Sequence, residues 1–66
     1  MILLGQIWKH KNHDFKAKVI GRALNKDLDL EVVHRGEDCG VKNHLVVGHR
    51  WSKSEYYFTR DYDLEG

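Results

Sequence analysis

The sequence predicts one small, mostly-β domain, and three observations lead to this prediction. Apolar and polar residues alternate with a period of two over most of the chain, which is the side-chain period of a β-strand. Turn-forming residues such as Asn25-Lys26-Asp27 separate the alternating runs. The chain has 66 residues and no proline, so we expect a single domain over residues 1–66 with one thin core.

The first two expected strands lie in the amino-terminal third of the chain. The first covers residues 2–8, with a bulge or bend at Gly5, and a polar loop over residues 9–14 follows. In the second strand, three apolar residues alternate with Lys16 and Lys18, which predicts a half-buried strand with a basic outer face. The apolar positions are Phe15, Ala17 and Val19.

The third strand is expected to form a hairpin with the second, around the turn at residues 25–27. Its apolar positions are Leu28, Leu30 and Val32, and they alternate with Asp29 and Glu31. Lysines of one strand can then lie opposite carboxylates of the other, each such pair contributing a few tenths of a kcal/mol. A charged loop over residues 35–40 precedes a fourth strand expected over residues 41–51.

A short helix is expected after the fourth strand. Ser52 and Glu55 fit the S-x-x-E capping box, and Trp51 and Tyr56 are placed for a hydrophobic staple. The helix should therefore begin at Lys53. It should end after one or two turns, because the run at residues 59–61 is poor helix material.

A fifth strand at Tyr62 and Leu64 completes the pattern. Four strands, a helical turn and a short last strand are the order of a five-stranded SH3-like barrel, and the chain resembles this architecture. It is also similar in pattern to short accessory proteins of phages and prophages. The positions that carry this resemblance are Gly5-Gln6-Ile7-Trp8, Trp51-Ser52, Phe58, Tyr62 and Leu64. The Ala-Leu-Tyr-Asp-Tyr run of peptide-binding SH3 domains is missing, so the resemblance does not imply proline-rich ligands.

Charge and cysteine content limit the possible functions. The net charge is +1, which is low for a dedicated DNA-coating protein, although residues 9–26 hold six Lys or Arg and one acid. The one cysteine, Cys39, cannot form an internal disulfide, which suits a reducing compartment. No apolar run is long enough for a signal peptide or a membrane span, so we expect a cytoplasmic protein.

The chemistry-bearing residues favour binding over catalysis. A core this thin leaves little room for the water-excluding cleft that most enzymes need, so we expect no enzymatic activity and no catalytic residue. Five histidines and Cys39 lack the paired spacing of a zinc site, so we also expect no metal and no cofactor. A Cys39–His44 nucleophile pair and carboxylate pairs such as Asp61 and Asp63 are weaker alternatives, since loop and outer-strand positions explain these residues.

Two kinds of binding are considered. The first is contact with a protein, as in a phage-type accessory or inhibitor, through residue types enriched at interface hot spots. The candidates for this contact are Arg50, Tyr56, Tyr57 and Tyr62. The alternative is a nucleic-acid-binding accessory protein that uses a basic face with an aromatic platform. Its candidates are Trp8, Lys9, Lys11, Lys16, Lys18 and Arg22. Exposed edge strands would also allow a homodimer.

Overall fold

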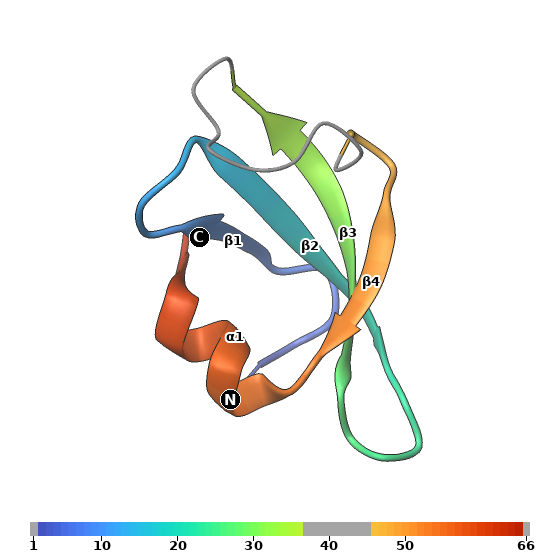
Figure 1. The fold of residues 1–66 in the computed structure, drawn as a ribbon. Helices are drawn as coiled ribbons and strands as arrows, with labels where there is room; N and C mark the ends of the chain where they lie inside the picture. The colour runs from blue at the N-terminus through green and yellow to red at the C-terminus, as the bar shows by residue number, and fades with distance from the viewer. Residues whose placement is uncertain (1, 37–45, 66) are drawn as a thin grey trace.

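Five antiparallel strands form one sheet in the order β4-β3-β2-β1-β5, with a short helix before the last strand (Figure 1). The computed structural model describes residues 2–36 and 46–65. The prediction of a mostly-β chain is confirmed, but the sheet is not closed into a barrel, because β4 and β5 remain as its two edges. The elements are β1 (Ile7–His10), β2 (Phe15–Arg22), β3 (Leu28–Arg35), β4 (Arg50–Lys53), α1 (Glu55–Asp61) and β5 (Tyr62–Leu64).

The β2–β3 hairpin follows the predicted alternation. All six predicted apolar positions of these strands are buried, and Lys18 lies opposite Glu31 across the strands, as expected. The turn forms as predicted too. The Ala23 amide donates to the Asp27 carbonyl at 2.8 Å, and Lys26 takes a left-handed φ of 72°. The buried positions are Phe15, Ala17, Val19, Leu28, Leu30 and Val32.

β1 begins later than predicted. Gly5 has a φ of 89°, in the left-handed region, and therefore turns the chain before the strand starts. The Gly5 amide still donates to the Val19 carbonyl at 2.8 Å, and the Val19 amide donates to the Gln6 carbonyl at 3.0 Å. The expected strand over residues 2–8 is therefore wrong over residues 2–6, and β1 extends two residues into the expected loop.

β4 is shorter than the expected strand over residues 41–51. Residues 41–45 lie outside the described residues. The next four residues form a turn, in which Gly48 has a φ of 96° and the His49 amide donates to the Val46 carbonyl at 2.9 Å. The strand therefore starts at Arg50, and Trp51 lies opposite Leu30 of β3.

The helix starts at Glu55, two residues later than the predicted start at Lys53, and runs further than predicted, to Asp61. Its N-cap is Ser54, whose hydroxyl accepts from the Tyr57 amide at 3.4 Å. Ser52 instead belongs to β4, where its hydroxyl donates to Asp29 at 2.8 Å, so the predicted capping box is wrong. The helix also includes Thr59, whose hydroxyl donates to the Glu55 carbonyl at 2.9 Å. The hydroxyl thus bonds to the carbonyl four residues earlier in the same helix, which continues to Asp61.

The core lies between the sheet and the inner side of α1. Phe58 is the buried residue of α1, and its ring stacks on Tyr62 of β5 at a centroid distance of 4.6 Å. Trp8 of β1 packs at 5.2 Å from Phe58. Figure 1 shows α1 following β4 and leading to the C-terminal end of the chain. Five of the seven helix residues are exposed.

A membrane crossing by a helix is not found in the described part of the chain, where α1 has only seven residues.

Candidate functional site

The outer surface of α1 carries two exposed tyrosines. Phe58 occupies the inward position of this helix, so its two preceding neighbours must point elsewhere. Tyr56 is 72% exposed and Tyr57 is 49% exposed. Their rings meet edge to face at 5.2 Å. The fold therefore leaves two large aromatic side chains in contact with solvent and with each other.

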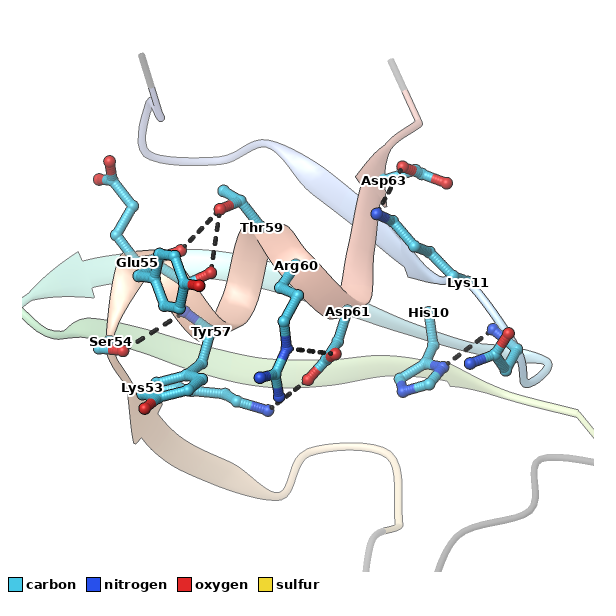
Figure 2. Close-up of polar contacts among 12 residues, drawn as sticks. His10, Lys11, Lys53, Ser54, Glu55, Tyr57, Thr59, Arg60, Asp61 and Asp63 are labelled. Carbon is cyan, nitrogen blue, oxygen red and sulfur yellow. Dashed lines mark hydrogen bonds and ion pairs between the residues drawn. The ribbon is translucent and has the colours of Figure 1, made fainter.

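Arg60 lies next to Tyr57 on the same side of the helix. The two residues are three apart, which places neighbouring side chains on one helix face. The Arg60 guanidinium carbon is 4.9 Å from the centre of the Tyr57 ring, within cation–π range. Figure 2 shows Arg60 between Tyr57 and Asp61. We call Lys53, Tyr56, Tyr57 and Arg60 the α1 surface.

Asp61 accepts hydrogen bonds from both cations of the α1 surface, Arg60 and Lys53. Its Oδ1 accepts from Arg60 Nε at 3.2 Å, and its Oδ2 accepts from Lys53 Nζ at 3.2 Å (Figure 2). These two hydrogen bonds lower the pKa of the Asp61 carboxyl. The bond to Asp61 also raises the pKa of Arg60. Two positive charges thus share one negative charge, and the cluster keeps a net charge of about +1 at neutral pH.

Two of the four predicted protein-contact residues do not join this surface. Tyr62 is only 6% exposed, because its ring completes the core against Phe58, and burial raises its pKa to about 12. Arg50 is exposed but lies on β4, where its Nε is 3.9 Å from Glu31 of β3. Its hollow on the sheet, lined also by Ile20 and Asp29, is separate from the α1 surface. Tyr62 is therefore withdrawn as a surface candidate.

Arg60 and Lys53 are the two members of the α1 surface that sequence reasoning missed. The spacing of Tyr57 and Arg60 would have indicated their contact if the helix had been extended through residue 61. Because the predicted helix ends before Thr59, the prediction does not place Arg60 on the same helix face as Tyr57. Lys53 meets Asp61 across the β4–α1 junction, and no local pattern indicates this contact.

Three of the predicted nucleic-acid contacts share the outer face of β1 and β2. Lys9 lies opposite Lys16, and Ile7 lies opposite Lys18. Lys16 Nζ is 2.7 Å from Glu65 Oε1, so its charge is compensated. Lys9 Nζ donates to the carbonyls of His10 and His13 at 3.3 and 3.4 Å. Among residues 2–36 and 46–65, Lys18 has no ion-pair partner.

The remaining nucleic-acid candidates are dispersed. Lys11 lies 3.9 Å from Asp63, and Arg22 pairs with Glu55 of α1 at 2.8 Å. Trp8 lies opposite the buried Ala17 and packs on Phe58, so its ring is on the core side of the sheet. Trp8 Nε1 is buried and has no hydrogen-bond partner among the described residues. The structure therefore does not place Trp8 beside the lysines of the outer face.

Two histidines meet at the end of β1. The rings of His10 and His13 are 4.8 Å apart, and the Asn12 amide donates to His10 Nδ1 at 3.1 Å. Burial lowers the pKa of His10, and the nearby His13 lowers it further. Within the described ranges, no three His, Cys, Asp or Glu side chains gather as metal ligands would. Cys39 and His44 lie outside these ranges.

Comparison with known proteins gives no relative. No family model, curated protein or solved structure matches this chain.

Proposed function

We propose that this protein is a non-enzymatic binding module that contacts a protein partner through the α1 surface. One observation carries the proposal. The core already uses Phe58, Tyr62, Phe15 and part of Trp8, whereas Tyr56 and Tyr57 are left exposed beside Arg60. Tyr and Arg are enriched among the residues that dominate binding energy at protein interfaces.

The arrangement of these side chains favours binding at low entropic cost. Arg60 is held by the Tyr57 ring on one side and by Asp61 at its Nε. A side chain that is already fixed loses less freedom when a partner covers it. The carrying helix is in turn fixed by Phe58 in the core. These contacts restrain the α1 surface before any partner binds, as the proposal requires.

The finer parts of the proposal are an SH3-like architecture and a role as a phage-type accessory or inhibitor in the cytoplasm. The SH3-like part is supported by the position of β1 between β2 and β5 and by the helix before the last strand. The phage-type role rests on the sequence pattern given above. Homodimer formation through the β4 or β5 edge is a separate proposal, and sedimentation of the purified protein tests it.

Affinity capture tests the proposed function. Purified, tagged protein is used to capture partners from a lysate of the cells that carry the gene. Tyr57→Ala should reduce capture of the bound protein roughly tenfold or more, as expected for a hot-spot tyrosine. Arg50→Gln is the control, because Arg50 is also exposed but lies on β4, away from α1. Equal capture by wild type and Tyr57→Ala would contradict the proposal.

Nucleic-acid binding is the second candidate function, and one observation favours it. Lys9, Lys16 and Lys18 share the outer face of two neighbouring strands. Phosphate contacts release counterions, so such binding must weaken steeply with added salt. A gel shift with mixed single-stranded oligonucleotides at low salt should then show a complex, and the triple change to glutamine should abolish it. The absence of a complex at micromolar protein would remove this candidate.

A further inference from the structure

The guanidinium of Arg60 forms a hydrogen bond through Nε, whereas the edge that carries Nη1 and Nη2 is open. Its Nε donates to Asp61, and its guanidinium carbon lies over the Tyr57 ring. Its terminal nitrogens Nη1 and Nη2 make no hydrogen bond to any residue in the described part of the chain. The side chain is 58% exposed. Arginine binds planar oxyanions through two parallel N–H bonds, and the open edge of Arg60 has this geometry.

Asp61 does not contact the open edge. Its Oδ1 accepts from Arg60 Nε, and its Oδ2 accepts from Lys53 Nζ. Glu55, the other acid of the helix, pairs with Arg22 of β2. The α1 surface therefore keeps an uncompensated positive charge next to two exposed aromatic rings.

The charge distribution favours an acidic protein segment over a nucleic acid at this surface. A nucleic-acid strand needs a track of cations along its phosphates. The α1 surface offers only Lys53 and Arg60, which share one carboxylate. The lysines that could form a track lie on the outer face of β1 and β2. The open edge of the Arg60 guanidinium lies beside Tyr57. Such a site suits a single carboxylate side chain whose neighbouring residues are uncharged.

We propose that the protein partner presents an Asp or Glu carboxylate from an acidic segment, which accepts two hydrogen bonds from Nη1 and Nη2 of Arg60 while adjoining side chains cover Tyr57. This inference rests on the proposed function and gives the partner a chemical class. The Tyr57 ring and Asp61 position the guanidinium, and Lys53 adds a second positive charge.

Peptide titration followed by NMR of the full chain tests the inference. The probe is a short acetylated, amidated peptide of alternating glutamate and glycine, and its control has glutamine at every glutamate position. The glutamate peptide should shift the amides of Tyr57, Arg60 and Lys53 with roughly millimolar affinity, because a single exposed pair binds weakly. Arg60→Lys should weaken this binding roughly fivefold although the charge is kept, since an ammonium cannot make the paired bonds. Arg50→Lys is the matched control and should bind as wild type does.

Several outcomes would overturn the inference. They are the absence of shifts on α1, equal shifts with the glutamine peptide, equal affinity of Arg60→Lys, and tighter binding of a short oligothymidylate to the same residues. Capture from the lysate separates this failure from failure of the proposed function. Capture that depends on Tyr57 but is unchanged in Arg60→Lys would leave the proposed function standing and remove the carboxylate. Capture independent of Tyr57 would remove both.

Discussion

The β2–β3 hairpin and the α1–β5 segment differ in how their side chains are used. In the hairpin every second residue of the central stretch is buried, so most of its apolar side chains stabilise the fold. In α1 only Phe58 is buried, and five of the other six residues are exposed. The comparison shows that α1 contributes one ring to the core, while the Lys11 amide, which donates to the Asp61 carbonyl at 2.9 Å, and the Arg22–Glu55 ion pair also fix it to the sheet. Most of the helix surface is left exposed, and this is where we propose that a partner binds.

The largest effect is expected where the helix joins the core. Phe58→Ala should lower the free energy of unfolding by roughly 3–5 kcal/mol, because it removes a fully buried aromatic ring and leaves a cavity. Domains this small have little stability to lose, so the variant should be largely unfolded at 25 °C. Urea unfolding followed by circular dichroism measures the change. Leu30→Ala in the hairpin should cost a similar amount, roughly 2–5 kcal/mol. A loss below about 1 kcal/mol for Phe58→Ala would show that α1 is not part of the cooperative unit.

The second prediction concerns Tyr62 at high pH. In the folded chain its pKa is about 12, whereas its ordinary value is 10.0. Above pH 10 the unfolded chain therefore releases this proton while the folded chain keeps it, and stability must fall by about 1.4 kcal/mol for each pH unit up to about pH 12. Below pH 10 the contribution of Tyr62 is fully present.

The difference between wild type and Tyr62→Phe isolates this effect, because all other titrating groups are shared. Free energies of unfolding from urea titrations at several pH values between 9 and 11 are sufficient. The loss of stability with pH should be smaller in Tyr62→Phe. Parallel curves for the two proteins would contradict the raised pKa that burial gives Tyr62.

A smaller effect distinguishes the two serines before the helix. Ser54→Ala should lower stability by about 0.5–1 kcal/mol, since Ser54 caps the helix through a long hydrogen bond. Ser52→Ala should cost less than about 0.5 kcal/mol, because Ser52 lies on an exposed face where water can replace its bond to Asp29. Urea unfolding of both variants gives the order. A larger loss for Ser52→Ala than for Ser54→Ala would contradict this order.

The strand pairing at the centre of the sheet could be predicted from the sequence, because its signals are local. The alternation in residues 15–19 and 28–32 and the turn at Asn25 are read directly from neighbouring residues. The strand ends could not be predicted. Gly5 and Gly48 adopt positive φ values, but the sequence does not show which glycine turns the chain and which remains extended.

The candidate site was predicted only in part, because long-range contacts decide it. Ser52 and Ser54 look alike as caps, and the pairing of Ser52 with Asp29 of β3 places Ser52 in a strand. Tyr62 resembles Tyr56 and Tyr57 in sequence, yet only Tyr62 meets Phe58 in the core. The exposure of Tyr56 and Tyr57 follows from Phe58 occupying the single inward position.

Urea unfolding of the double variant Tyr56→Ala/Tyr57→Ala tests the central claim. The claim is that the fold positions the α1 surface, whereas the exposed tyrosines of that surface contribute little to the stability of the fold. The free energy of unfolding should stay within about 1 kcal/mol of wild type, the loss arising from the Tyr57–Arg60 contact. A loss of about 3 kcal/mol or more, comparable to that of a buried ring, would contradict the claim by showing that the two tyrosines belong to the core.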